Sequence, residues 1–242
     1  MIYNIIEENF EDVINEYILT NFIIIIDYRG YRGKEDKPQF EAFYDCYKNN
    51  NRKYDWISFF DFDEFLELKE PNQNIKDFLG NSRFKDCINI KINWLMFSDN
   101  DLLFYENQTL KERFLTPILN DSANLIIKST IRGNLKINYW KNMNNPHSSN
   151  NNFISCSTSG KIIDSKAFFN IPPDFKYAIL KHYATKTIEE YCLKLKKGRS
   201  DTKRELDNKT LNETLNNYFF KRNRKTNEKI NYIKKIFNIT LH

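Results

Sequence analysis

Apolar and polar positions alternate with two different periods along the first part of the chain. Apolar side chains recur at helical spacing over residues 8–21, and a β-branched run follows at Phe22–Asp27. After a polar, glycine-containing segment, Pro38 opens a second helical stretch, which is followed by the apolar run Trp56–Phe60. This order of helix, strand, helix and strand predicts an α/β fold with a mostly parallel sheet flanked by helices.

Shorter signals follow in the rest of the chain. Cys87–Trp94 alternates apolar and polar residues, which predicts a half-buried strand. Thr187 and Glu190 have the spacing of a capping box, which predicts a helix over Thr187–Lys197. The other predicted elements are a helix at Ile75–Leu79 ended by Gly80, a short helix or turn within residues 108–119, strands at Leu125–Ile131, Leu135–Tyr139 and Ala178–Ala184, and an exposed loop at Asn142–Asn152.

Composition adds a division of the chain. A length of 242 residues with 40% hydrophobic and 15% aromatic residues is enough for one large domain or for a domain with an appendage. The net charge is only +5, but basic residues are concentrated in residues 194–235. We therefore predict a main domain over residues 1–199 and a basic helical extension over residues 200–242. The extension suits an anionic partner, or is simply a solvated helical face; no nucleic-acid-binding module is recognisable.

The cysteines and the N-terminus bear on the compartment. Cys46, Cys87, Cys156 and Cys192 are widely separated and form no C-x-x-C pair, so we expect neither a zinc site nor a disulfide framework. A reducing compartment follows from that expectation. The N-terminus lacks the pattern of a signal peptide, and the longest apolar run is far shorter than the roughly 18 residues of a membrane span. The prediction is a soluble, cytoplasmic protein.

The candidate chemistry lies directly after the run Trp56–Phe60. Asp61, Asp63 and Glu64 follow that apolar run, and carboxylates at the end of a buried strand repel one another and are costly to bury without a cation. Ligands of α/β proteins bind at the carboxyl ends of strands. Oxygen ligands favour Mg²⁺ or Mn²⁺, which leave room for substrate phosphates. The alternative is a chance D-x-D pair on a solvated loop.

Several segments together resemble the family 92 glycosyltransferases and their family 2-like relatives. W-I-S-F-F-D-F-D-E-F at residues 56–65 resembles the family's "hydrophobic strand, D-x-D-E-F" signature. The further matching segments are N-W-L-M-F-S at 93–98, with Ser98 where the family has Gly; K-S-T-I-R at 128–132; His147, preceded by Pro146 in place of Val; and K-H-Y at 181–183 with residues 186–191 and 197–199. The ordered set spans residues 8–200.

The resemblance implies a GT-A type, Rossmann-like fold and a metal-dependent glycosyltransferase. Such an enzyme moves a hexose from a nucleotide-sugar, expected to be a UDP-sugar, to a saccharide acceptor in surface glycan or polysaccharide synthesis. Mn²⁺ or Mg²⁺ would bridge the donor diphosphate and assist its departure. The resemblance makes Asp61, Asp63 and His182 the metal-binding residues. Asp63 is the preferred direct ligand, and Asp61 would contact the ribose or the ion.

The same resemblance suggests the other site residues. Lys186 and Arg199 are expected to contact donor phosphates, and Arg132 is a further donor-binding candidate that could instead pair with a surface carboxylate. If the enzyme inverts, Asp99 or Asp101 is the candidate general base. Without the resemblance, a histidine in an apolar strand, such as His182, is more often a core residue. The basic extension would lean on the inner face of an anionic membrane, where lipid-linked acceptors reside.

Two alternatives remain open. The family begins with a strand and loop that bind the nucleotide base, and the chain starts near the end of the second strand, at Ile2–Asn4. We therefore expect the first strand to be lacking, and a catalytically impaired remnant or a binding module is one alternative. A haloacid-dehalogenase-like phosphatase also places D-x-D after an apolar strand, with the first Asp as nucleophile. That class normally has Thr or Val where Glu64 stands here.

Overall fold

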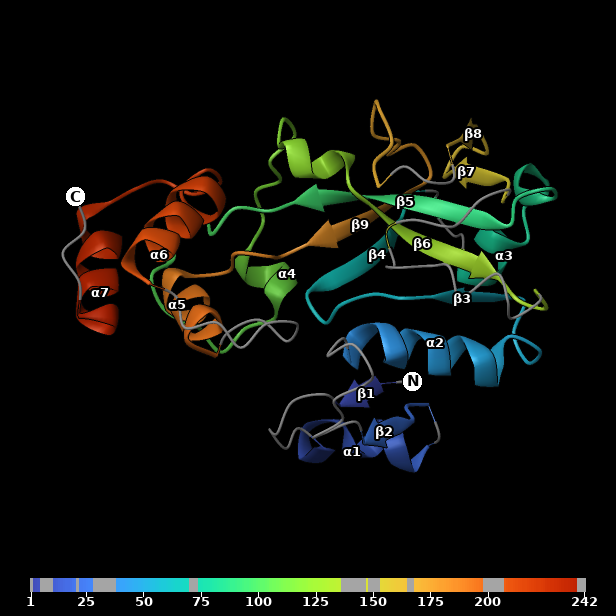
Figure 1. Cartoon of the computed structure of the whole chain (residues 1–242), viewed down its shortest axis with the longest axis horizontal. Coiled ribbons are helices and arrows are strands. Elements are labelled where there is room, and N and C mark those ends of the chain that lie inside the picture. Colours follow the sequence, from blue (N-terminus) through green and yellow to red (C-terminus); the bar gives the residue numbers. More distant parts are fainter. Residues whose placement is uncertain are drawn as a thin grey trace.

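The computed structural model describes residues 2–4, 11–20, 22–27, 38–69, 74–135, 147, 153–164, 168–197 and 207–238. A twisted sheet occupies the centre, helix α2 (Pro38–Asn50) lies along one side of it, and the C-terminal helices gather at one end (Figure 1). All but the first residue of the predicted strand at Leu135–Tyr139 and most of the predicted loop at Asn142–Asn152 lie outside the described residues.

The N-terminal elements form a small parallel unit. Strand β1 (Ile2–Asn4), helix α1 (Glu11–Leu19) and strand β2 (Ile25–Asp27) follow one another, and the two strands pair in parallel. The unit lies beyond α2 as seen from the main sheet (Figure 1). A helix between two strands returns the chain to the same end, so parallel pairing follows from the local order. The sequence-based prediction of a helix followed by a strand is confirmed here.

Within the described residues, the main sheet has seven strands. They are β3 (Trp56–Ser58), β4 (Glu64–Leu68), β5 (Asn89–Met96), β6 (Ile127–Arg132), β7 (Ser155–Ser157), β8 (Ile162–Ile163) and β9 (Ala178–His182). The order is β3-β6-β5-β7-β8, and β9 pairs with β5 on one side and with β4 on the other. Strand β5 therefore has three partners: β6, β7 and β9.

The α/β character is as predicted, but a mostly parallel sheet is not what the described strands form. In the main sheet only the β5–β7 and β5–β9 pairs are parallel, whereas β3–β6, β4–β9, β5–β6 and β7–β8 are antiparallel. The prediction extended the pattern of the first sixty or so residues to the whole chain. Beyond α2, several successive strands are joined without a long crossover helix, which permits antiparallel pairing.

Strand β5 differs from its prediction in burial. All of its residues are buried, although the alternating sequence predicted one solvated face. Its polar side chains have internal partners instead: the Lys91 ammonium donates to the Asp164 carbonyl oxygen at 2.7 Å, and the Asn93 amide donates to the Asn124 carbonyl oxygen at 3.0 Å. Buried polar groups require such partners, so the alternation marks a polar interior layer rather than a surface.

Local capping signals fixed several helices. Helix α3 (Ile75–Leu79) has the predicted bounds, and its N-cap Asn74 accepts hydrogen bonds from two backbone amides. Helix α5 (Ile188–Lys197) has the predicted capping box between Thr187 and Glu190. The remaining helical elements are η1 (Ser82–Phe84), α4 (Leu110–Arg113), η2 (Ser122–Leu125), α6 (Asn208–Thr214), the π-helical η4 (Leu215–Phe219) and α7 (Asn227–Phe237).

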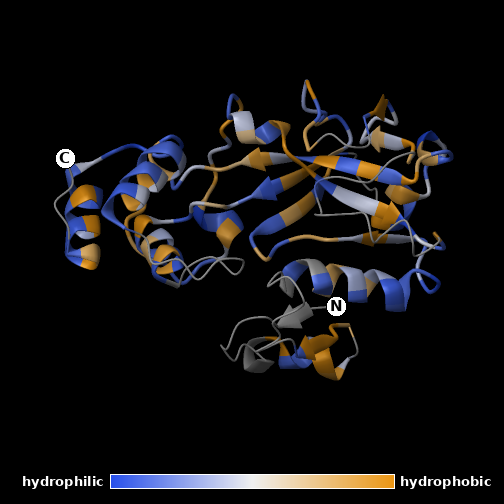
Figure 2. Ribbon diagram, viewed as in Figure 1, coloured by the Kyte–Doolittle hydropathy of each residue, from blue (hydrophilic) through white to orange (hydrophobic). Residues whose placement is uncertain are grey.

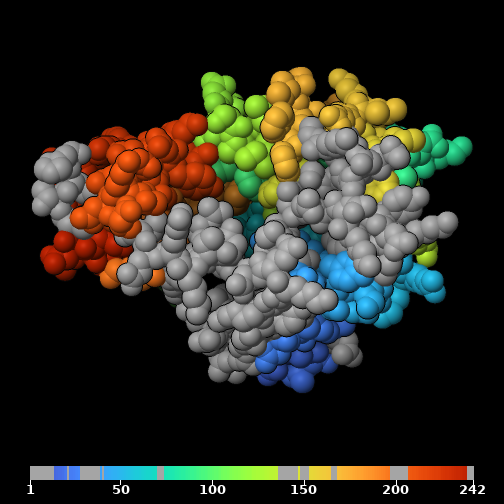
Figure 3. Space-filling model, viewed as in Figure 1, coloured from blue at the N-terminus to red at the C-terminus, as the bar shows by residue number. Residues whose placement is uncertain are grey.

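Helix α5 joins the C-terminal elements in one hydrophobic cluster. We call α5, α6, η4 and α7 the C-terminal helical cluster; its core includes Tyr191, Leu215, Phe219 and Ile233. Figure 2 shows apolar and polar residues alternating around these helices, and Figure 3 shows α6, η4 and α7 as a bulge at one end of the molecule. Packing is therefore continuous from α5 into the segment that we predicted to be an extension.

A disulfide corrects one expectation. Cys87 and Cys156 are bonded, and they connect the segment just before β5 to its parallel neighbour β7. The spacing of the cysteines gave no sign of this pairing because the two residues meet only through the sheet register. Disulfides persist in oxidising environments, so the inference of a reducing compartment loses its basis. Cys46 and Cys192 do not take part in a disulfide among the described residues.

Candidate active site

The D-x-D segment forms a tight turn between β3 and β4. The backbone amide of Glu64 donates to the Asp61 carbonyl oxygen at 3.0 Å, and the backbone amide of Asp61 donates to Glu64 Oε2 at 3.1 Å. Strand β4 begins at Glu64, which lies opposite His182 in the antiparallel β4–β9 pair. The turn therefore brings Asp61, Asp63 and Glu64 to the end of β9 where His182 lies.

A lysine from β6 meets the first carboxylate of the motif. Lys128 Nζ lies 2.8 Å from Asp61 Oδ2 and 3.4 Å from Glu64 Oε1, and its side chain is only 1% exposed. The other oxygen of Asp61 accepts a hydrogen bond from Gln39 Nε2 of α2 at 3.3 Å. The sequence argument required a cation among these carboxylates, and the chain itself supplies one.

Glu64 has an unusual protonation equilibrium. Burial raises the pKa of its carboxyl group to about 8, the neighbouring Asp61 charge adds to that effect, and Lys128 opposes it. A raised pKa in an acid beside a lysine indicates that burial outweighs the ion pair.

Asp63 lies beside His182 and two lysines. Asp63 Oδ1 is 3.6 Å from His182 Nε2, and Asp63 Oδ2 is 3.7 Å from Lys194 Nζ of α5. Burial alone would raise the pKa of Asp63, but His182, Lys194 and Lys186 lower it below its usual range. Lys186 has a left-handed backbone, with φ of 54°, just before α5. Asp63 is thus a carboxylate held in its charged form.

Two histidines flank the ring of Trp94. The rings of His182 and Trp94 are 4.2 Å apart, and those of His147 and Trp94 are 5.3 Å apart. Burial lowers the pKa of both histidines, for His147 to about 4, with the Lys128 charge as a further cause. His147 Nδ1 is 2.6 Å from the Ile127 carbonyl oxygen, whereas Trp94 Nε1 and His182 Nδ1 are buried with no partner in the described residues. His182 thus faces Asp63 with Nε2, while its other ring nitrogen is buried.

The predicted metal ligands fit an ion only in part. Within the described residues, no group of three or more His, Cys, Asp or Glu side chains is arranged to hold a metal. Asp63 and a neutral His182 could share one ion, and Mg²⁺-type ions commonly bind one or two protein ligands together with substrate phosphates. Asp61 has both oxygens engaged by Lys128 and Gln39. The structure brings Asp61, Asp63 and His182 together, with Asp61 already paired.

The candidate general bases contact the C-terminal helical cluster. Asp99 Oδ2 is 2.5 Å from Lys229 Nζ of α7, and the Asp99 amide donates to Asn223 Oδ1 at 2.7 Å. Asp101 is half exposed and lies 3.4 Å from Arg224. Both acids line an open hollow of about 390 Å³ between the loop after β5 and the segment before α7. Their described contacts do not include Asp61, Asp63 or His182.

The two arginine candidates have different outcomes. Arg132 lies at the opposite end of β3 from the D-x-D turn: its guanidinium donates to the carbonyl oxygens of Cys87 and Phe84 and stacks over Trp56 at 4.3 Å. It is therefore occupied in joining β6 to the segment before β5. Arg199 lies outside the described residues.

Comparison with protein-family models identifies the chain. The model described as Glycosyltransferase family 92 matches residues 1–241. The chain belongs to glycosyltransferase family 92. A search of curated proteins finds no match. Family 92 membership agrees with the resemblance carried by the D-F-D-E-F segment and indicates a transferase that has a sugar donor and an acceptor.

The candidate site includes two lysines that are not among the predicted site residues. Lys128 stood in the segment K-S-T-I-R, where only Arg132 was considered as a site residue. Lys194 lies in the predicted helix after His182, more than a hundred residues from Asp63 in sequence, so no local pattern links the two residues.

None of the helices in the described part of the chain combines the length and apolarity needed to cross a bilayer.

Proposed function

We propose that this family 92 protein transfers a hexose from a nucleotide-sugar, a UDP-sugar in the first instance, to a saccharide acceptor in surface glycan synthesis. The observation that carries the proposal is the charged Asp63 beside His182 at the D-x-D turn, with Lys194 and Lys186 close by. A carboxylate, an imidazole and two ammonium groups at one sheet edge suit a diphosphate and its counter-ion. The proposal includes a GT-A type arrangement.

Each side chain has a proposed task. Asp63 and His182 would hold Mn²⁺ or Mg²⁺, and a bound ion would supply Lewis-acid stabilisation of the departing diphosphate. Lys194 and Lys186, with Arg199, would bind phosphate oxygens. Asp61 is held by Lys128 but its side chain is 42% exposed, so it can accept a hydrogen bond from a donor hydroxyl.

A general base is required only if the reaction inverts the anomeric centre. Asp99 and Asp101 remain the candidates, and Asp101 is the better one because its carboxylate is half exposed while that of Asp99 is buried against Lys229. The hollow beside them is polar and would accommodate part of a saccharide acceptor. The impaired remnant and the phosphatase stay as the competing hypotheses.

Thermal unfolding with candidate donors tests the proposal. We expect UDP-sugars with Mn²⁺ to raise the midpoint of the wild-type chain, and to do so much less for D63N. E106Q, which changes an exposed acid in a loop away from the turn, is the matched control and should respond like wild type. Release of free hexose from the donor then distinguishes a transferase from a remnant. No shift with any nucleotide-sugar would favour the remnant, and phosphate release from simple phosphomonoesters would favour the phosphatase.

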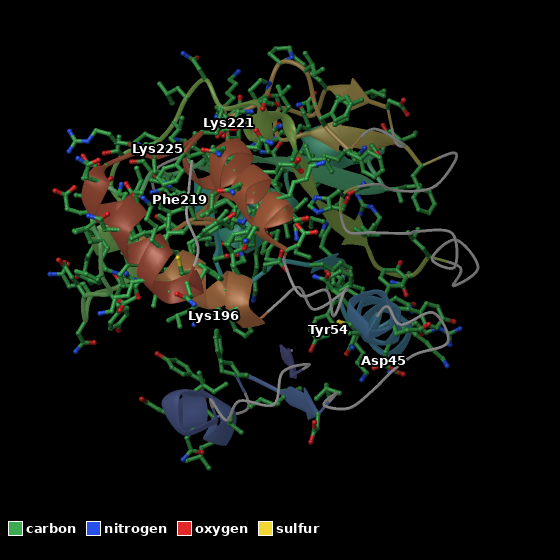
Figure 4. All side chains as sticks on the ribbon, turned by 60° about the vertical axis from the view of Figure 1, so that its left-hand side comes forward. Asp45, Tyr54, Lys196, Phe219, Lys221 and Lys225 are labelled. Atoms are coloured by element: carbon green, nitrogen blue, oxygen red, sulfur yellow. A yellow bond between two sulfur atoms is a disulfide. The ribbon has the colours of Figure 1, made fainter. Side chains whose placement is uncertain are left out.

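We further propose that the C-terminal helical cluster contacts an anionic membrane that carries lipid-linked acceptors. Residues 207–238 contain eight Lys and Arg residues and three Asp and Glu residues. This segment therefore carries a net charge of +5, the same as that of the whole chain. Lys221 and Lys225 extend from the same side of these helices (Figure 4). Clustered lysines bind anionic bilayers with about 1 kcal/mol per residue.

Vesicle sedimentation checks the membrane proposal. We expect the chain to sediment with vesicles containing phosphatidylserine and not with purely zwitterionic vesicles, and K221E/K225E should weaken sedimentation several-fold. K161E, which changes an exposed lysine near β8, is the control. Equal binding to both vesicle types would contradict the proposal.

A further inference from the structure

We propose that Lys128 is a built-in counter-cation of the D-x-D segment, a positioning residue that holds Asp61 and Glu64 and keeps a divalent ion away from Asp61. The ion is then left to Asp63 and His182. This inference rests on the proposed function only for the identity of the ion. It gives the two aspartates of the motif separate tasks, one fixed by the chain and one open to a ligand.

The sheet register places Lys128 at the turn. Strand β6 pairs with β3 so that Thr130 lies opposite Ser58, and the two hydroxyl oxygens are 2.8 Å apart. Lys128 lies two residues before Thr130 on the same face of β6, so its side chain reaches past the end of β3 to the turn. The ammonium group arrives at the turn from the sheet interior and not from the solvent side.

Burial leaves the Lys128 ammonium with few possible partners. The Lys128 side chain is 1% exposed and that of Glu64 is 0% exposed, so water is not an alternative partner for the ammonium. An ammonium withdrawn from water needs acceptors, and Lys128 has the Asp61 carboxylate at 2.8 Å and the Glu64 carboxyl group at 3.4 Å. Arg132, four residues on along the same face, uses carbonyl oxygens as acceptors and leaves these carboxylates to Lys128.

The ammonium and a divalent ion would compete for Asp61. Asp61 Oδ2 accepts from Lys128 at 2.8 Å, and an ion bound to that oxygen would lie next to the buried Lys128 ammonium, a second positive charge. Asp63 has no such short contact among the described residues, because both of its ion-pair distances exceed 3.5 Å. A ligand atom can approach Asp63 without displacing a buried cation.

Manganese binding in the absence of any sugar nucleotide tests the inference. The free Mn²⁺ signal in electron paramagnetic resonance gives the affinity for the full-length chain. We expect K128M to bind Mn²⁺ at least tenfold more tightly than wild type, because Asp61 and Asp63 then share a site without a competing cation. In the wild-type background we expect D61N to change the affinity by less than about threefold and D63N to weaken it at least tenfold. The D61N change should abolish the gain of K128M.

Controls separate position from charge. K161M removes an exposed lysine and should bind Mn²⁺ like wild type, which excludes a simple effect of net charge. K128R keeps the cation and should not gain affinity. If K128M does not fold, D61N and D63N still decide the matter in folded chains, since equal losses of Mn²⁺ affinity in both would overturn the inference. A folded K128M with wild-type affinity would overturn it as well.

The readout also distinguishes this inference from the proposed function. Failure of every nucleotide-sugar to bind would count against the transferase proposal and would leave the Mn²⁺ comparison intact. If wild type binds no Mn²⁺, a gain by K128M still supports the counter-cation, and no gain rejects it.

Discussion

Replacing Lys229 by Met tests how firmly the C-terminal helical cluster is attached to the sheet. The Lys229 side chain is fully buried, its ammonium lies 2.5 Å from Asp99 Oδ2, and the Asp99 side chain is only 2% exposed. Removing one partner of a buried ion pair typically costs about 3–5 kcal/mol, because the other charge remains buried without compensation. For a chain of this size, that loss corresponds to a fall of roughly 10 °C in the thermal midpoint.

The pH dependence of this variant has a defined sign. Burial raises the pKa of Asp99 above that of the unfolded chain, and loss of the Lys229 charge raises it further. A folded acid with a raised pKa binds protons more readily than the unfolded chain, so stability falls as the pH rises. We therefore expect the deficit of K229M relative to wild type to be larger at pH 8 than at pH 5.

Urea unfolding of a double-mutant cycle measures the effect. D99N/K229M removes both charges, so we expect it to be more stable than K229M and the coupling energy to be at least about 2 kcal/mol. K235M, which changes an exposed lysine on the same helix, should lie within about 0.5 kcal/mol of wild type. If K229M lies within 1 kcal/mol of wild type at pH 8, the buried pair does not anchor the cluster and the reasoning is refuted.

Other changes probe the sheet and its edge. The C87S/C156S variant lacks the disulfide, which closes a loop of 69 residues. Chain entropy predicts that this variant loses about 4 kcal/mol of unfolding free energy. A reductant should lower the urea midpoint of the wild-type chain to a similar degree. E190Q should cost about 1–3 kcal/mol at pH 7. Burial opposes the shift, but the bidentate contact with Arg113 lowers the pKa of Glu190. The stabilisation is therefore present above the unfolded pKa and is lost as the pH falls through the folded one, so the cost of E190Q should shrink at acidic pH. G133A should cost about 2–3 kcal/mol in urea unfolding, because the added Cβ would lie 1.9 Å from the Tyr54 carbonyl oxygen. If G133A has the same urea midpoint as wild type, the turn can move to make room for the methyl group.

Elements governed by short-range chemistry were predictable. Helix α3 was bounded by its N-cap and Gly80, and helix α5 by its capping box, since both signals lie within a few residues of the helix ends. The D-x-D segment was also identified locally, as acids that follow an apolar run. The same applies to the assignment to family 92, which rested on ordered segments and which the family model confirms.

Features that depend on strand register were not predictable. The β4–β9 pair, which sets Glu64 opposite His182, joins residues more than a hundred positions apart. The disulfide and the Lys128–Asp61 pair likewise arise only when β5, β6 and β7 are in place. The expectation of a cation among the carboxylates is met by a lysine from a predicted strand, and the metal itself stays a prediction.

The three-fold pairing of β5 has a consequence for how the molecule opens. Its first half pairs with β7, its second half pairs with β9, and β6 follows its other edge. An amide proton on β5 can exchange with solvent only after neighbouring strands separate. The chain runs from the end of β5 to Asp99, which contacts α7, and β9, which pairs with β5, leads into α5. Strand β5 is thus linked both to the C-terminal helices and, through β9 and β4, to the D-x-D turn. We therefore expect exchange at β5 to require opening of the main sheet, with which the β1–β2 pair shares no ladder in the described residues.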